Sequence, residues 1–473
     1  MIGRQNTQLN FFDQEIFSRL IPQDHPLVKI KQIVDFSVIR EAVEHLYDRE
    51  KGRPSYPPET LFKMLFLEVW ANLSDVQVCQ QLQYNLLYRY FCDIGWNDPV
   101  PDDTTLVVFR RRLGPDMFAK LFVLIVEQAR ERGLLKGEWA VIDGTKLTAH
   151  AAVKNTLSLV REGRQRIVHE LARVDKRRAE ELKEYAEPLP DREYASHREL
   201  LAAEIARGKE LVDKVRGCRE VLKTVETYRA ILEKKGVASL SDPDARWGFQ
   251  NKGEPFLGYK VHTTCDETGI VTGVKVTPGN EAEVAQAEEI VGNLIDRGLK
   301  PTRMAGDKAY DNSALRKTLT DKGIQPYVPS RTKKDRLKEQ GFTYNKRSGT
   351  VRCRWGKKAI GSTPHQDGGL LFYFSEKDCQ HCPMKGSCLS SSETRKRVYV
   401  RPEVFQNRPR GIKRAMRIRK TIERLFAEAK IWHGMARARY RGLGKVTIQV
   451  LMTFICLNIK KMAQRVQLEP AVT

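Results

Sequence analysis

The stretch that decides the fold is WAVIDGTKLTAH, residues 139–150, in which a short apolar run ends in Asp143 and is followed at once by Gly144. A short apolar run bounded by turn residues is typical of a buried strand. We therefore predict a strand here, with a single carboxylate at its end. An aspartate before a glycine is usually a turn residue, so a functional role for Asp143 depends on which other residues the fold brings beside it.

The segments that follow residue 240 alternate between strand and helix patterns. They predict a strand pair over 256–280 with its turn at 266–269, a helix over 281–298, a short strand over 302–312, a helix over 313–323 and a short strand over 324–330. Together with the first strand, this order predicts a mixed α/β domain.

Two segments interrupt that order. Residues 155–240 are dense in Arg, Lys and Glu with Leu and Val at helical intervals, which predicts an inserted helical hairpin whose charged face is solvated rather than bound to DNA. Residues 331–400 form a second insert that contains a cysteine cluster. We expect these parts: a helical N-terminal DNA-binding domain (1–135), an α/β catalytic domain (136–154, 241–330 and 401–445), the charged insert (155–240), the Cys-containing insert (331–400), and a C-terminal helix with its tail (446–473).

The first 135 residues show helical periodicity. Ser74 followed by Gln77 predicts a capping box at the start of one helix, and residues 99–114 predict a turn and a short helix with an arginine cluster. The cluster consists of Arg110, Arg111 and Arg112. Short helices that end in such a cluster are typical of helix-turn-helix DNA-binding domains. A plain helical bundle with a solvated basic face is the alternative.

Basic residues outnumber acidic ones in the composition. The 473 residues include 82 Lys and Arg against 59 Asp and Glu, a formal net charge of +23. This charge favours a polyanionic partner, with nucleic acid ahead of an anionic membrane surface. The N-terminus lacks the basic-then-apolar layout of a signal peptide, so we expect a cytoplasmic protein.

The most apolar stretch lies near the C-terminus, over residues 446–462. It is shorter than the ~20 residues that a membrane-spanning helix needs. It also contains Thr447, Gln449 and Asn458. We therefore predict a buried core helix and no membrane contact.

A helical pattern over 415–434 carries a third acid of interest. Its apolar stripe consists of Ile418, Ile422, Leu425 and Ala429. Arg419, Glu423 and Lys430 share the face beside this stripe, whereas Glu428 lies about 140° from Glu423 around the helix. Glu423 is therefore the glutamate that can be held against a sheet.

Asp143, Asp307 and Glu423 stand out as a set, because adjacent strand ends can bring two aspartates together beside a packed helix. Clustered carboxylates repel one another and normally need a cation between them. Hard Mg²⁺ or Mn²⁺ suits such oxygen ligands. Two such ions can activate the attacking oxygen and stabilise the leaving oxygen of a phosphodiester displacement. The residues alone thus predict metal-dependent phosphodiester chemistry.

Four motifs together resemble the DDE transposases of bacterial insertion sequences. They are VIDGTKL (141–147), GYKVH with the later VTPGNEAE (258–283), GDKAYDN (306–312) and RIRKTIERLFAEAKIWHGMARARYRGLGKV (417–446). Residues 50–115 resemble the helical N-terminal domain of that superfamily. The resemblance implies a ribonuclease-H-like catalytic core in which Asp143, Asp307 and Glu423 bind two Mg²⁺ or Mn²⁺ ions.

A Tyr, Arg, Glu, Lys signature of related transposases maps onto Arg419, Glu423 and Lys430, with Met416 in place of the tyrosine. That departure leaves the acidic triad intact. The residues expected to contact DNA phosphates are Arg419, Lys430, Arg437, Arg439, Arg441, Arg110 and Arg111. Such contacts position a duplex without reading its sequence.

The resemblance also implies a reaction: nicking at the ends of a mobile element, followed by attack of the freed 3′-hydroxyl on target DNA. The implied partners are double-stranded DNA, as terminal inverted repeats and target, and a second copy of the chain in a homodimer on DNA. It implies a bacterial, nucleoid-associated protein. Two alternatives stay open: a DNA-binding protein without catalytic activity, and a ribonuclease-H-like nuclease that cuts without joining.

Four cysteines form a separate candidate site. Cys379, Cys382 and Cys388 have the spacing C-x2-C-x5-C, and Cys353 is a candidate fourth ligand. Thiolates in this pattern suit a structural Zn²⁺ site or an iron–sulfur cluster. Free thiols are the alternative. The remaining cysteines are scattered and are predicted to be packing residues.

Overall fold

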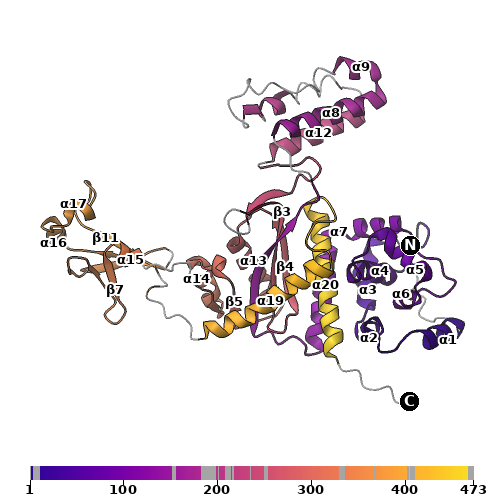
Figure 1. Cartoon of the computed structure of the whole chain (residues 1–473), viewed down its shortest axis with the longest axis horizontal. Coiled ribbons are helices and arrows are strands. Elements are labelled where there is room, and N and C mark those ends of the chain that lie inside the picture. The colour runs from indigo at the N-terminus through magenta and orange to yellow at the C-terminus, as the bar shows by residue number, and fades with distance from the viewer. Residues whose placement is uncertain are drawn as a thin grey trace.

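The structure is a computed structural model, which describes residues 2–3, 11–48, 50–151, 156–182, 199–200, 202–207, 215, 218–234, 236–249, 254–329, 336–366, 368–401, 404 and 411–466. A mixed sheet lies at its centre, with the N-terminal helices on one side and two inserts that project away from the sheet (Figure 1). The proposed tail (467–473) and the middle of the charged insert (183–198) lie outside the described residues.

The central sheet is built around the strand that the opening stretch predicts. Its strands are β1 (Trp139–Thr148), β2 (Arg246–Phe249), β3 (Pro255–Cys265), β4 (Val271–Pro278), β5 (Arg303–Ala305) and β6 (Gln325–Tyr327). The order is β2-β3-β1-β5-β6, and β4 also pairs with β3. β3 runs antiparallel to β1 and β4, whereas β5 runs parallel to β1 and β6. The predicted strands are confirmed, and β2 is an addition that the pattern did not reveal.

Alternation along β1 determines which helices pack on each face of the sheet. Ala140 and Ile142 pack with residues of α13 (Glu283–Asp296) and α14 (Ser313–Asp321). Val141 and Leu147 point the other way and join the core that contains residues of α19 (Ile412–Trp432) and α20 (Leu443–Arg465). Successive strand side chains point to opposite faces, so a helical layer covers each face of the sheet.

The C-terminal apolar stretch forms α20, which packs against α7 and β4 (Figure 1). Its polar side chains are satisfied inside the protein: Asn458 accepts from Val271 N–H at 2.8 Å and donates to Val271 C=O at 2.9 Å. Among the described residues, α20 is the one helix long and apolar enough to cross a membrane, and 78% of its most apolar window is buried. The prediction of a buried core helix is confirmed.

The N-terminal region is helical, as predicted. Its helices are α1 (Phe11–Leu20), α2 (Pro26–Ile33), α3 (Ser37–Val43), the 3-10 turn η1 (Glu44–Leu46), α4 (Pro58–Trp70), α5 (Asp75–Tyr84), α6 (Leu86–Phe91) and α7 (Asp103–Glu131). The Ser74–Gln77 capping box opens α5. Gly114, with φ of 65°, and Pro115 kink α7 directly after the arginine cluster. A left-handed conformation costs a glycine little, which explains why the helix bends at this residue.

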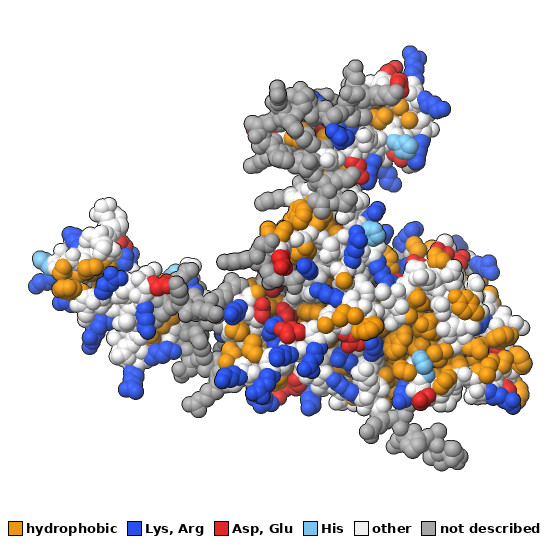
Figure 2. Space-filling view, in the orientation of Figure 1, with side chains coloured by type: hydrophobic (Ala, Val, Ile, Leu, Met, Phe, Trp, Pro, Cys, Tyr) orange, Lys and Arg blue, Asp and Glu red, His pale blue; other side chains and the backbone are white. Residues whose placement is uncertain are grey.

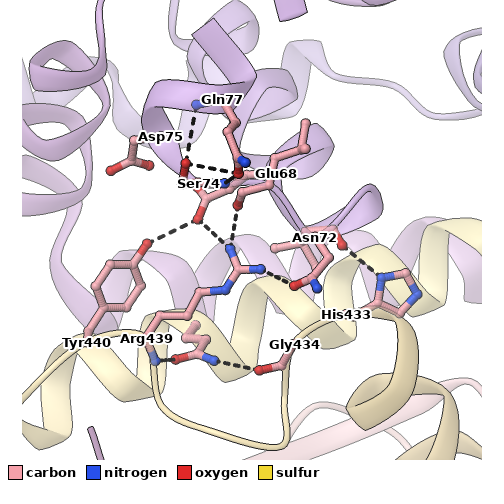
Figure 3. A network of polar contacts seen from close by, with 12 residues as sticks. Glu68, Asn72, Ser74, Asp75, Gln77, His433, Gly434, Arg439 and Tyr440 are labelled. Carbon is pink, nitrogen blue, oxygen red and sulfur yellow. Dashed lines mark hydrogen bonds and ion pairs between the residues drawn. The ribbon is translucent and has the colours of Figure 1, made fainter. Parts of the chain in front are cut away.

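The N-terminal helices and the sheet share one continuous hydrophobic core across residue 135. Polar contacts reinforce this junction (Figure 3): Arg439 Nη1 donates to Glu68 Oε1 at 3.1 Å, and Tyr440 Oη donates to the same oxygen at 3.2 Å. His433 Nδ1 lies 2.8 Å from Val69 C=O. The chain that follows α19 is therefore bound to α4 by polar contacts, and the N-terminal helices and the sheet meet in a packed interface.

Both inserts have hydrophobic clusters of their own. The described part of the charged insert contains α8 (Thr156–Val174), α9 (Lys176–Glu181) and α12 (Arg219–Glu233), and α8 packs against α12 as a hairpin requires. The Cys-containing insert consists of α15 (Arg336–Glu339), β7 (Phe342–Asn345), β8 (Thr350–Cys353), β9 (Gly361–Pro364), β10 (Leu370–Tyr373), α16 (Glu376–Gln380), α17 (Lys385–Cys388) and β11 (Arg397–Val400). Figure 1 shows the two inserts leaving the sheet in different directions.

Candidate active site

Asp143 lies on β1 just beyond the part that pairs with β5. The parallel pairing of β1 with β5 ends at Val141, and Asp143 remains paired with Thr263 of β3. Its Oδ1 accepts a hydrogen bond from Gly144 N–H at 2.9 Å. Its Oδ2 accepts from Arg419 Nη1 at 2.6 Å. The carboxylate is therefore held between its own strand and α19, at the place where β1 and β5 part.

Arg419 connects two of the predicted acids. One guanidinium nitrogen contacts Asp143 and the other contacts Glu423, one helical turn further along α19. The Glu423 side chain keeps 47% of its surface exposed, whereas that of Asp143 keeps 14%. The structure thus brings the acids of β1 and α19 together on either side of one cation.

Asp307 completes the predicted set from the next strand. It follows β5 and caps the 3-10 turn η3 (Lys308–Tyr310), where its Oδ1 accepts from Ala309 N–H at 2.7 Å. Burial raises the pKa of the Asp143 carboxyl to about 7; Arg419 lowers it, and the negative charges of Asp307 and Glu283 raise it further. Asp307 is therefore within electrostatic range of Asp143. The prediction that Asp143 lies at the end of its strand is wrong, because pairing with β3 extends β1 to Thr148.

The chemical type of these groups suits a divalent metal ion, because carboxylate oxygens are the ligands that Mg²⁺ and Mn²⁺ prefer. The raised pKa of Asp143 indicates buried negative charge that Arg419 does not fully compensate. Across the described residues, no three His, Cys, Asp or Glu side chains are arranged to hold a metal ion. A guanidinium lies between Asp143 and Glu423 instead. The carboxylate oxygens are thus donors of the type that fits a divalent ion. In this structure the cation beside them is the Arg419 guanidinium.

Several predicted phosphate contacts lie on accessible parts of the surface. Lys430 is half-buried on α19, and burial together with the charge of Lys146 lowers its pKa. Arg437 is exposed, and exposed Arg441 donates to His150 C=O at 3.2 Å. Arg111 is exposed on α7. In Figure 2, Lys and Arg side chains gather over the region of α19, with acidic side chains among them.

Two predicted phosphate contacts require correction. Arg110 is 9% exposed and forms ion pairs with Glu68, at 3.0 Å, and with Asp75. Arg439 binds Glu68, Asn72 and the Leu73 carbonyl in the junction shown in Figure 3. Both guanidinium groups are already held by protein acceptors, so we assign them to the junction between the two parts rather than to DNA.

Met416 occupies the position where the related signature has tyrosine. It is partly buried and packs beside Trp139 and Ala415 in a small apolar cluster. Trp139 also stacks at a tilt on Tyr327, with ring centroids 5.0 Å apart. Met416 therefore packs against the start of β1 and contributes to the hydrophobic core.

The structure groups the four predicted metal-binding cysteines at one end of their insert. Cys353 ends β8, Cys379 lies in α16, Cys382 follows α16 and Cys388 ends α17. Burial raises the pKa of the Cys388 thiol, Lys396 lowers it, and the other three cysteines raise it further. Cys388 is thus within electrostatic range of the other three cysteines, and the described residues contain no group of His, Cys, Asp or Glu arranged to hold a metal ion.

Glu283 and Tyr310 are site residues that the sequence reasoning did not single out. Glu283 begins α13, and its charge acts on both Asp143 and Tyr310. Tyr310 ends η3 and is fully buried. The only sequence signals were their places inside the motifs VTPGNEAE and GDKAYDN.

Two family models match the chain. Residues 15–112 match a model described as Transposase domain (DUF772), and residues 220–459 match a model described as Transposase DDE domain. The second match includes Asp307 and Glu423 but begins after β1, so Asp143 is related to them by the pairing of β1 with β5 and by its contact with Arg419. No solved structure matched the chain.

Proposed function

This chain belongs to the transposase DDE domain family, and we propose that it cleaves DNA at the ends of an insertion sequence and joins the freed 3′-hydroxyl groups to target DNA. The family implies a ribonuclease-H-like fold for the part of the chain built on the mixed sheet. Asp143, Asp307 and Glu423 are the residues that would hold Mg²⁺ or Mn²⁺. Bound ions of this kind activate the attacking oxygen and stabilise the leaving oxygen of a phosphodiester displacement.

The observation that carries this proposal is the bridge that Arg419 makes between Asp143 and Glu423. The two acids are 280 positions apart in sequence, yet one guanidinium touches both. Carboxylates gathered from separate elements are the oxygen ligands that a metal-dependent phosphodiester site uses. The Arg419 guanidinium neutralises the two carboxylates here; if divalent ions took over that role, its planar fork of donors would be suited to bind a DNA phosphate.

Strand joining distinguishes this proposal from its alternatives. The experiment incubates purified protein with Mg²⁺, labelled element ends and a target plasmid, and separates nicked from joined products on a gel. A transposase gives both products. Nicked ends without joined products identify a nuclease, and retarded but intact DNA identifies a binding protein without catalytic activity.

DNA binding is expected to weaken steeply with salt. The net charge of +23 and the basic surface around α19 favour contact with phosphates. A protein that neutralises several phosphates loses roughly 10³- to 10⁵-fold in duplex affinity between about 50 and 200 mM salt, because each contact releases condensed counterions. Fluorescence anisotropy with a labelled duplex measures this slope. Affinity that is flat over the same range would contradict the proposed phosphate contacts.

We propose that Cys353, Cys379, Cys382 and Cys388 hold a structural zinc ion or an iron–sulfur cluster. Elemental analysis of the purified protein is expected to find about one zinc ion per chain, or iron with inorganic sulfide, because thiolate sites of this kind are structural and closed. Cys382→Ser should lower the metal content. Cys218→Ser, which changes a cysteine at the start of α12, is the control and should leave it unchanged. Wild-type protein with neither metal would overturn the assignment.

A further inference from the structure

Glu283 lies beside the proposed catalytic acids, at the first residue of α13 and on the opposite face of β1 from Arg419. We propose that Glu283 is a fourth carboxylate of the metal centre and helps to hold a divalent cation together with Asp143 and Asp307. This inference rests on the proposed function, because it assumes that Asp143 belongs to a metal site.

The carboxylates of Asp143 and Glu283 both lie next to Gly144. Asp143 Oδ1 accepts the Gly144 N–H at 2.9 Å. On the other face, a Cβ at Gly144 would lie 3.2 Å from the carboxylate carbon of Glu283 and 3.4 Å from its Oε1. Gly144 does not have a positive φ, so its backbone does not require glycine. The missing side chain instead leaves room for the Glu283 carboxylate directly against the strand.

Tyr310 supplies an independent sign that this space takes a ligand. The residue is 0% exposed, and its hydroxyl has no hydrogen-bond partner in the part of the chain that the structure describes. A buried polar atom without a partner commonly marks an absent water or ion. The Tyr310 backbone N–H donates to the Asp307 C=O at 3.2 Å, so this buried residue lies directly beside one of the three acids.

The start of α13 gives Glu283 a structural role that has to be separated from metal binding. A carboxylate in the first helical turn interacts favourably with the helix dipole, and Lys260 Nζ lies 3.9 Å from Glu283 Oε1. Lys260 is closer to the Glu281 carbonyl, at 3.0 Å. Neither interaction requires a glycine at position 144 or a buried hydroxyl nearby. Those two features point to a cation shared with Asp143.

The test measures Mn²⁺ binding to the full-length protein by isothermal titration calorimetry, without DNA. Variants Asp143→Asn, Glu283→Gln and Glu289→Gln are compared with wild type. Glu289 lies on the same helix, is 55% exposed and pairs with Lys275, so it controls for the loss of one charge from α13. Glu283→Gln is expected to weaken Mn²⁺ binding about tenfold, within the range seen when supporting metal-site residues are removed. Glu289→Gln should bind Mn²⁺ as wild type does.

The outcomes separate this inference from the proposed function. If Asp143→Asn loses Mn²⁺ binding while Glu283→Gln binds Mn²⁺ like Glu289→Gln, the assignment of Glu283 as a fourth carboxylate is wrong and the proposed triad is retained. If Asp143→Asn and Glu283→Gln both bind Mn²⁺ as wild type does, the proposed metal site is wrong and this inference is wrong with it. Melting in metal-free buffer shows whether Glu283→Gln is folded. Glu283→Asp is the second variant, and because it keeps the charge its affinity should lie between those of Glu283→Gln and wild type.

Discussion

Glu423→Gln is expected to abolish both nicking and joining while the protein remains folded and binds DNA. Loss of one proposed metal ligand removes several kcal/mol of transition-state stabilisation, and about 4 kcal/mol corresponds to roughly a 10³-fold slower reaction. The Glu423 side chain is about half exposed and pairs with Arg419 of the same helix, so its removal costs the fold little. Duplex affinity should be maintained or increased, because the substitution removes a negative charge beside a guanidinium. Product formation with labelled element ends and an anisotropy titration measure the two effects.

Glu428→Gln is the matched control on the same helix. Glu428 faces α20, where its Oε1 lies 2.5 Å from Lys460 Nζ, and it makes no contact with Asp143 among the described residues. We expect this variant to keep most of its cleavage activity and to lose some stability through the weakened ion pair. An active Glu423→Gln protein beside an inactive Glu428→Gln protein would reverse the assignment of the third acid.

Local patterns were sufficient to predict most of the sheet and the helices that cover it. The apolar run at 139–150, the turn at 266–269 and the stripe on 415–434 each depend on residues close in sequence. The structure bears out β1, the β3–β4 pair and α19 at these places. Periodicity reports which face of an element is buried. It does not report which distant element covers that face.

The shared core illustrates that limit. The helical pattern of residues 1–135 gave no sign that α20 packs against α7, since this contact joins residues more than 300 positions apart. The arginine cluster had the same ambiguity. Arg110, Arg111 and Arg112 are identical in type, and only the fold shows that the first is buried while the other two are exposed.

The candidate site was predicted in part for a similar reason. Asp143 and Glu423 lie within recognisable elements and Asp307 follows one, so the three could be selected as a set. Glu283 could not be selected, because an acid in the first turn of a helix has an ordinary explanation in the helix dipole. Its closeness to Gly144 depends on how α13 packs against β1. That packing is a tertiary property, which no local pattern encodes.

Arg110→Ala is expected to destabilise the protein strongly. The guanidinium is buried, bonds to Glu68 and Asp75, and lies 5.3 Å from the centre of the Tyr440 ring. Burial already raises the pKa of Glu68 to about 7, and Arg110 is the partner that most lowers it. Removing one member of a buried ion pair leaves uncompensated charge and costs about 3–5 kcal/mol. Because the entropy of unfolding is about 2 cal/mol/K per residue, a loss of this order lowers the melting temperature of a 473-residue protein by about 3–5 °C.

Arg111→Ala changes the neighbouring residue and should have the opposite effect: stability stays nearly unchanged and DNA binding weakens. Arg111 is exposed on the same helix, and surface substitutions usually change stability by less than about 0.5 kcal/mol. If Arg111 contacts a phosphate, its loss should weaken duplex binding and reduce the salt slope by about one. Thermal unfolding followed by circular dichroism and anisotropy at several salt concentrations measure both properties for both variants. An Arg110→Ala protein that melts like wild type but binds DNA weakly would contradict the buried role of Arg110, and would restore it as a phosphate contact.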